Sequence, residues 1–169
     1  HTSKPEVAAA AVAAGADVIN DVTGLRGDER MLEVAVECGA GLVVMHMKGT
    51  PRTMQASPEY VDVVSEVREF FEERLELCQS AGIDPERICF DPGIGFGKSL
   101  QHNLELLRHL PELRVGNRPL LIGVSRKSFI GKLVGSDAVA KRSWGTEPEW
   151  SITKRRSAFP EQPVTFILI

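Results

Sequence analysis

The sequence predicts an α/β protein, built from parallel strands that alternate with helices as part of a (β/α)8 barrel. Four uninterrupted apolar segments are separated by sequence of helical periodicity, which is typical of parallel strands covered on both faces. Polar residues follow each apolar segment, at the strand ends where such barrels carry their chemistry. A doubly wound open sheet is the alternative, and the absence of a dinucleotide-binding fingerprint favours the barrel.

The first helix and strand come at the start of the chain. Ser3 and Glu6 have the spacing of a capping box. The alanine-rich run that follows has high helix propensity and ends at Gly15. Residues 16–19 then form an apolar strand, which ends in Asn20 and Asp21.

The second unit repeats this order. Asp28 stands where it could cap a helix that runs to about Cys38 and is closed by Gly39. Residues 41–44 are apolar and predict the second strand. That strand leads into Met45 and His46.

A longer helix and the third strand follow an irregular polar loop. Ser57 and Pro58 have the order of a cap and a first-turn proline, and they predict a long helix that ends at Gly82. Residues 87–90 predict the third strand. It ends in Asp91.

The loop after the third strand contains alternating glycines and reads Asp91-Pro92-Gly93-Ile94-Gly95-Phe96-Gly97-Lys98. Glycines permit a positive φ and a close approach of backbone to a ligand, and free N–H groups near a helix start favour anions. The spacing matches neither the phosphate-binding loop nor the dinucleotide fingerprint. A tight turn that needs glycine only for its geometry is the structural alternative. Ser99 is the expected cap of the next helix, which runs to about Leu110.

Residues 119–124 predict the fourth strand, and a cationic cluster follows it. Parallel strands would bring the polar residues of all four strand ends to one edge. Because an ionised carboxylate only accepts hydrogen bonds and an ammonium only donates them, this set could bind a flat heterocycle with amide-like edges. The candidates are Asn20, Asp21, Met45, His46, Asp91 and the cluster Ser125-Arg126-Lys127-Ser128.

Each candidate also has a structural interpretation. His46 is more often a satisfied structural residue at such a position, and Asp21 is more often the cap of the loop that follows it. The cluster at residues 125–128 could be an exposed turn, but it directly follows the most apolar strand, which favours a functional role. We see no zinc-type spacing, catalytic triad or glycosidase carboxylate pair, so the residues indicate binding and electrostatic catalysis.

Composition excludes several classes of protein. The 169 residues are 43% hydrophobic and carry a net charge of −3 without a basic stripe, which argues against nucleic-acid binding. No apolar run approaches the roughly 18 residues of a membrane span. Three isolated cysteines fit buried thiols in a reducing compartment and hence a cytoplasmic protein. The start at His1 reads as a cut boundary, so we expect part of the protein to precede it.

Several ordered motifs together resemble dihydropteroate synthase, a family of pterin-binding TIM-barrel enzymes. They cover about residues 2 to 146. The motifs are Thr2-Ser3-Lys4-Pro5, Ile19-Asn20-Asp21, Met45-His46-Met47-Lys48-Gly49, the glycine loop from Asp91 to Lys98, and Ser125-Arg126-Lys127-Ser128.

The resemblance implies an enzyme of folate synthesis that joins p-aminobenzoate to 7,8-dihydropterin-6-ylmethyl diphosphate and is inhibited by sulfonamides. It implies that Phe96, Lys127 and Ser128 flank the aminobenzoate. A supporting loop role falls to Gly93, Gly95, Gly97, Ser125 and Arg126. The pterin-binding residues implied are Asn20, Met45, Asp91, Gly123 and Lys127.

The resemblance also implies Mg²⁺ and a homodimer. The family's opening strands, which carry the usual metal and diphosphate ligands, would precede His1, so we assign no metal ligand within this chain. The dimer would rely on later helices that are missing or altered here, and we do not expect it for this chain. An incomplete barrel leaves strand edges open, which predicts poor stability and little turnover.

The resemblance stops after Thr146, which divides the chain into a partial pterin-binding barrel at residues 1–146 and a divergent tail at residues 147–169. We hypothesise that the tail arose from a shifted reading frame or a chimeric assembly. Reading the coding sequence in all three frames tests this, because the idea fails if no other frame restores the family's last helix and strand.

Two other functions remain open at this point. One is a pterin-dependent methyltransferase domain, which would share a polar strand-end Asn and Asp. The motifs at residues 45–47 and 125–128 argue against it. The other is a catalytically inactive pterin-binding module.

Overall fold

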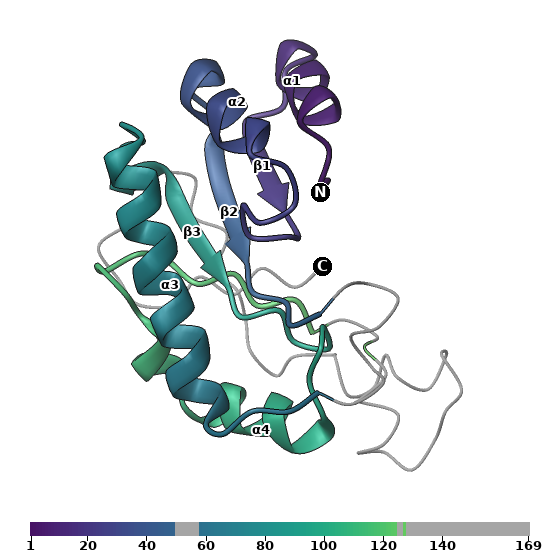
Figure 1. Ribbon diagram of the computed structural model, residues 1–169, viewed down its shortest axis with the longest axis vertical. Helices are drawn as coiled ribbons and strands as arrows, with labels where there is room; N and C mark the ends of the chain where they lie inside the picture. The colour runs from purple at the N-terminus through teal and green to yellow at the C-terminus, as the bar shows by residue number, and fades with distance from the viewer. Residues whose placement is uncertain (50–57, 125–126, 128–169) are drawn as a thin grey trace, which may run out of the picture.

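The computed structural model describes residues 1–49, 58–124 and 127 (Figure 1). Helices and parallel strands alternate along the chain, as the sequence predicts. In order, the elements are α1 Pro5–Ala13, β1 Val18–Asp21, α2 Arg30–Cys38, β2 Gly41–Met45, α3 Val63–Ser80, the 3₁₀ turn η1 Pro85–Arg87, β3 Ile88–Asp91, α4 Leu100–Arg108 and the 3₁₀ turn η2 Leu110–Leu113.

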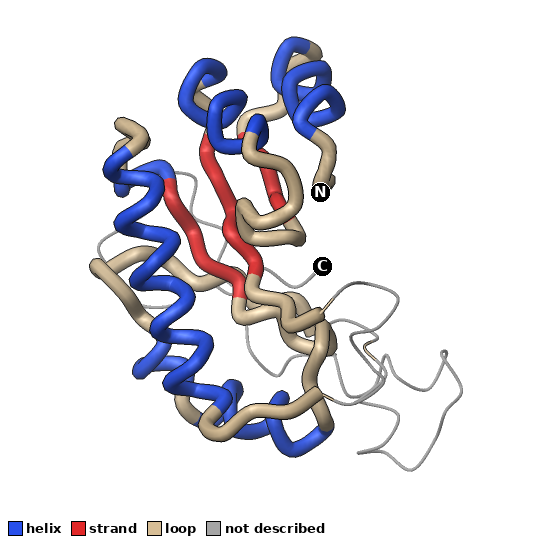
Figure 2. The backbone as a smooth tube through the Cα atoms, viewed as in Figure 1, coloured by secondary structure: helices blue, strands red, loops and turns tan. Residues whose placement is uncertain are grey.

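The strands β1, β2 and β3 form one parallel sheet in chain order (Figure 2). The order continues at both sides, because Thr2 bridges Asp21 and Leu120 bridges Phe90 in parallel fashion. The backbone N–H of Leu121 donates to the Phe90 carbonyl at 2.8 Å. Successive neighbours without a reversal of strand order, within the described residues, are typical of a barrel and not of a doubly wound sheet.

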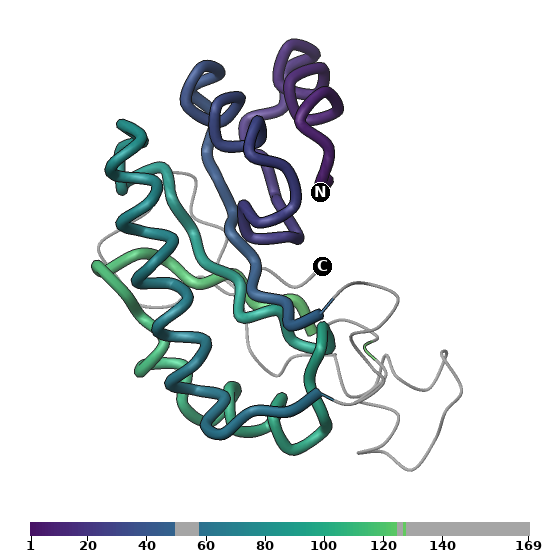
Figure 3. Tube along the Cα trace, viewed as in Figure 1, coloured from purple at the N-terminus to yellow at the C-terminus, as the bar shows by residue number. Residues whose placement is uncertain are grey.

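Within the described residues, the fourth predicted strand pairs with β3 through this single bridge and does not form an extended ladder. Figure 3 shows the green segment after η2 returning to β3. Its apolar residues Leu120 and Ile122 are buried in the main core. The segment therefore occupies the predicted place beside β3, with less regular pairing.

The sheet has two distinct faces. Phe71 of α3 stacks on Phe90 of β3 with ring centroids 4.5 Å apart, so helices cover this face. The other face carries a separate small cluster of Val43, Cys89 and Leu121. Because barrels keep their helices outside, this second face corresponds to the barrel interior. Val18 lies on it and is 49% exposed.

Two of the predicted helix starts are wrong. Lys4 is the N-cap of α1 and no side chain caps that helix, so Ser3 and Glu6 do not form a capping box. The helix expected from Pro58 begins only at Val63, where the Asp62 carboxylate accepts from two backbone N–H groups. Ser57 lies outside the described residues.

Other ends follow the sequence closely. Gly39 closes α2 in the left-handed conformation, at φ 70°. The predicted cap of α2 is displaced by one residue, because Asp28 accepts from the Arg30 backbone N–H at 3.0 Å but the N-cap is Glu29, which makes no side-chain cap hydrogen bond. Ser99 caps α4 in a capping box with His102. Among the described residues, no helix has the length and apolar character needed to cross a membrane.

Candidate functional site

Three predicted site residues meet at the carboxyl ends of the strands. Met45 at the end of β2 pairs with Asp91 at the end of β3, so both side chains lie on the same face. Asn20 pairs with Val43, two residues before Met45, and therefore shares that face. This is the interior face of the partial barrel, as the sequence predicts.

Asp91 is a deeply buried carboxylate. Its side chain is 6% exposed, and one oxygen accepts from the Gly93 backbone N–H at 2.7 Å. Burial raises the pKa of Asp91 to about 6, and the Gly93 N–H, Lys127 and Lys98 oppose that rise. The group is therefore ionised above pH 6, when it offers only hydrogen-bond acceptors.

Lys127 approaches the glycine loop from the end of the fourth predicted strand. Its Nζ lies 4.0 Å from the centroid of the Phe96 ring, which is a cation–π distance. Burial lowers the pKa of Lys127, while Asp91 acts in the opposite direction. Gly95 faces the Lys127 side chain, and a Cβ there would lie 3.2 Å from Cδ. The lysine thus joins an aromatic ring and a carboxylate.

Asn20 offers an unused acceptor. Its Oδ1 is buried and has no hydrogen-bond partner among the described residues, whereas buried polar atoms are nearly always paired. Gly123 presents open space, since a Cβ there would meet nothing within 4 Å. Both positions are compatible with a ligand on the interior face.

The glycine loop packs against its neighbour more closely than the sequence suggests. Gly93 and Gly97 have φ of 66° and 61°. A Cβ on them would collide with the carbonyl oxygens of His46 and Lys48. The missing side chains of these two glycines therefore make room for the backbone that leaves β2, and the approach of a flat ligand to this loop stays a prediction.

Lys98 is the second departure from the expected anion cradle. The residue is 3% exposed, and its ammonium contacts His46 Nδ1 at 3.0 Å, the His46 carbonyl at 3.3 Å and the Phe96 carbonyl at 3.0 Å. Burial lowers the pKa of Lys98 to about 7, with Asp91 opposing. Burial, reinforced by Lys98, lowers the pKa of His46 to about 2, so this ring is neutral. The structural interpretation of His46 fits these contacts.

Asn103 is a site-supporting residue that the sequence analysis missed. Its Oδ1 accepts from the Gly95 N–H at 2.8 Å, and its Nδ2 donates to the Ser99 carbonyl at 2.7 Å. It is buried on α4 together with Leu106. The sequence feature that could have indicated this role is a single amide side chain on the buried face of the helix.

Asp21 has the local role that the sequence favours. It is fully buried on the helix-covered face. Its carboxylate accepts from the Thr23 N–H at 2.9 Å, the Thr23 hydroxyl at 2.8 Å and the Leu25 N–H at 2.7 Å. It shapes the loop after β1 and does not face the interior.

A family described as pterin binding enzyme matches residues 1–150 of this chain. The match covers most of the sequence. The chain belongs to this family.

Named relatives agree with this assignment. Dihydropteroate synthase from Synechocystis is 45% identical over 145 residues, which are 86% of this chain and 50% of that protein. The Escherichia coli K12 enzyme of that name is 48% identical over 133 residues, covering 79% of this chain and 47% of the relative. The chain thus spans about half the length of the curated relatives it matches.

A solved structure of the Xanthomonas albilineans enzyme, in complex with 7,8-dihydropteroate, matches with a TM-score of 0.78 and 45% identity. The match covers 85% of this chain and 52% of that one. The chain therefore folds as part of a (β/α)8 barrel of the pterin-binding family, which confirms the predicted fold class.

Three predicted site residues, Ser125, Arg126 and Ser128, lie outside the described residues, and so do residues 147–169. Among the residues that are described, no group of three or more His, Cys, Asp or Glu side chains could hold a metal ion.

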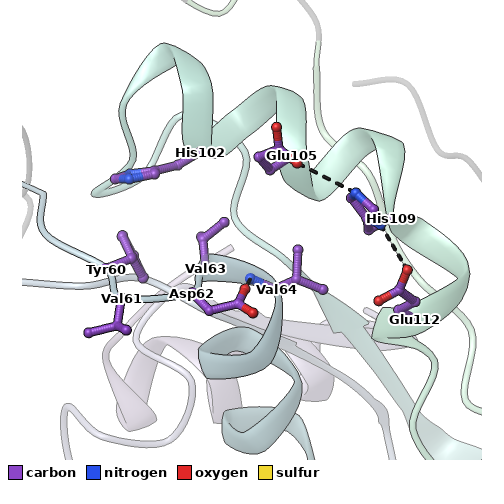
Figure 4. Close-up of a pocket in the computed structure, with 9 residues that line it drawn as sticks. All are labelled: Tyr60, Val61, Asp62, Val63, Val64, His102, Glu105, His109 and Glu112. Carbon is purple, nitrogen blue, oxygen red and sulfur yellow. Dashed lines mark hydrogen bonds and ion pairs between the residues drawn. The ribbon is translucent and has the colours of Figure 1, made fainter.

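A hollow of about 380 Å³ lies between the start of α3 and α4, and its lining includes none of the strand-end site residues (Figure 4). Its polar groups are paired with one another, since His109 contacts Glu105 at 3.5 Å and Glu112 at 2.8 Å. Tyr60 on its wall donates to the Gly97 carbonyl at 2.9 Å. The hollow thus borders the glycine loop through Tyr60.

Proposed function

We propose that this chain is the central part of a dihydropteroate synthase. That enzyme joins p-aminobenzoate to 7,8-dihydropterin-6-ylmethyl diphosphate and releases diphosphate. The observation that supports it best is the buried Asp91 carboxylate on the interior face, which interacts electrostatically with Lys127, whose Nζ in turn lies 4.0 Å from the centroid of the Phe96 ring. Relatives of that name share nearly half of the residues over the matched length.

The pterin would bind at the strand ends of β1, β2 and β3. Ionised Asp91 accepts hydrogen bonds from the N–H edge of the pterin ring, and Asn20 Oδ1 gains the partner that it lacks. Met45 is buried next to Asp91 in the sheet and lines the ring's flat side. Gly123 leaves room beside them.

The aminobenzoate would lie against Phe96 and Lys127. Aromatic stacking suits its ring, and the ammonium suits its carboxylate. We include Ser128 among the aminobenzoate contacts because of the sequence motif alone. Ser125 and Arg126 would support the lysine that lies between them and Ser128.

Catalysis would rest on positioning and charge. Breaking the bond to diphosphate leaves positive charge on the pterin methylene, and the nearby Asp91 carboxylate stabilises that charge in a water-poor site. The amine of aminobenzoate then attacks the methylene carbon and loses a proton. The described residues form no cluster that could hold the Mg²⁺ implied by the resemblance, and the steps above use only residues of this chain.

The proposal includes a cytoplasmic location, because both substrates are water-soluble and the cysteines are free. It does not include a homodimer for this chain. The segment expected to differ from the family's later helices lies outside the described residues.

Fluorescence titration of the chain with the pterin diphosphate tests the proposal. We expect quenching that saturates, and we expect Asp91→Ala to abolish it. Asp17→Ala, at an exposed carboxylate away from the site, is the matched control. A folded chain that binds no pterin, or an Asp91→Ala variant of unchanged affinity, would contradict the assignment.

A condensation assay with aminobenzoate separates an enzyme from an inactive binding module. The assay belongs on the longest protein that contains this segment. Pterin binding without dihydropteroate formation there would favour the inactive module.

A further inference from the structure

We propose that Lys98 is a positioning residue, which clamps the glycine loop onto the exit of β2 and thereby holds Asp91 and Phe96 in place for the pterin and the aminobenzoate. The inference rests on the proposed function for its ligands. In this role Lys98 would contact neither substrate and would act only through the residues that it holds.

The first observation is the match of donors and acceptors. An ammonium has three N–H donors and no acceptor, and Lys98 Nζ has three acceptors within reach. Two belong to His46 at the exit of β2, and the third is the carbonyl of Phe96. Because the ammonium can only donate, His46 Nδ1 is the acceptor and its proton is on Nε2. The lysine thus ties two loops by one buried atom.

The second observation is the tight packing of the same two loops. Gly93 and Gly97 leave no room for a Cβ against the carbonyls of His46 and Lys48. Tyr60 donates to the Gly97 carbonyl from outside at 2.9 Å. Asn103 holds the Gly95 N–H from α4. Lys98 is the charged member of this arrangement, and it contacts the carbonyl of Phe96, one of the residues proposed to contact the substrates.

The third observation is electrostatic. Lys98 is one of the two cations that lower the pKa of Asp91 against the effect of burial, the other being Lys127. Asp91 in turn raises the pKa of Lys98. Removing the ammonium should therefore make Asp91 harder to ionise. Among the described residues, the charged or titratable groups that interact electrostatically with this pair are His46, Cys89, His102, Arg26 and Lys127.

Two substitutions in this chain separate the hydrogen bonds from the charge. Lys98→Met removes both, and Lys98→Gln removes the charge but retains an N–H donor. Lys48→Met is the matched control, since Lys48 lies on the neighbouring loop in an exposed pair with Glu66 at 2.7 Å.

Amide hydrogen exchange measures directly how firmly the glycine loop is held, and it needs no ligand. We expect the Phe96 and Gly95 amides to exchange about 10-fold faster in Lys98→Met, because hydrogen bonds to a charged group are lost. The effect should be smaller in Lys98→Gln, and Ala35 in α2 should be unchanged. Equal acceleration at Ala35 would mean general destabilisation and would overturn the proposal, as would an unchanged Phe96 amide.

The pH dependence of pterin diphosphate binding reads the effect on Asp91. The acid midpoint should lie near pH 6 in the unmodified chain, following the Asp91 pKa of about 6. It should move to higher pH in both Lys98 variants and stay in place in Lys48→Met. A purely structural lysine would change affinity and leave the midpoint where it is. Absence of pterin binding in the unmodified chain would contradict the proposed function, while the exchange experiment would still decide on the clamp.

Discussion

Asp91 is the residue at which stability and function make opposite demands. Burial raises its pKa to about 6 from an ordinary value of 3.8. The fold therefore favours the protonated carboxyl, whereas the proposed pterin contact needs the ionised one. Such opposition is common at functional sites.

The opposition predicts that Asp91→Asn stabilises the protein above pH 6. A raised pKa means that the stability contributed by the protonated carboxyl is complete below about pH 4 and is lost as the pH rises through 6. The neutral amide avoids that loss, which is worth about 2–3 kcal/mol for such a shift. Urea unfolding between pH 4 and 8 measures it, with Asp17→Asn as the control. Parallel pH profiles for Asp91→Asn and the unmodified chain would contradict the prediction.

Gly93, two residues after Asp91 in the same loop, is a position where substitution should lower the stability of the fold. Gly93→Ala should lower the free energy of unfolding by about 3 kcal/mol, because it adds a collision with the His46 carbonyl to the strain of a positive φ. Gly82→Ala is the control, since its φ is also positive, at 87°, but nothing lies within 4 Å. It should cost only about 1 kcal/mol. Equal costs at both sites would show that the loops can move apart.

Residue roles were partly predictable from the sequence. The rim position of Asp91 and Asn20 followed from strand ends, which are local features. The acceptors of Lys98 did not, since His46 lies 52 residues away in sequence. Only the parallel register of β2 and β3 brings those two together. The close packing of Gly93 against the His46 carbonyl was not predicted for the same reason, because that neighbour follows another strand.

At the scale of elements, apolar runs gave the strands and their order, while helix starts were less certain. Ser3 and Ser99 both precede a helical run, yet only Ser99 accepts from a backbone N–H of its helix, at 3.1 Å from His102. The spacing of a capping box is a short pattern. Whether it forms depends on how the chain enters the helix, and Lys4 already has that position in α1.

Ser99→Ala should therefore destabilise the protein by about 1 kcal/mol through loss of the cap on α4. Ser3→Ala should leave the free energy of unfolding unchanged, because Ser3 is exposed and does not cap α1. Chemical unfolding of both variants provides the comparison. A cost at Ser3 equal to that at Ser99 would restore the predicted capping box.

The whole molecule is an arc of a barrel. Strand neighbours follow chain order from Thr2 to Leu120, and the interior face near Val18 is open in the described residues. The sequence allowed this architecture to be predicted because buried parallel strands have continuous apolar runs. The resemblance implies that the pterin contacts lie on these strands, whereas the usual diphosphate contacts lie on the family's opening strands.

This division predicts that the chain binds pterin but forms dihydropteroate far more slowly than a complete relative. Each electrostatic group missing from a catalytic site lowers the rate by about 10²-fold or more, and the chain spans about half of the Escherichia coli relative. The measurement is product formation at saturating substrates, with that relative as the control under the same conditions. Comparable rates would contradict the prediction, and they would mean that strand ends β1 to β3 with Lys127 suffice for diphosphate departure as well as for pterin binding.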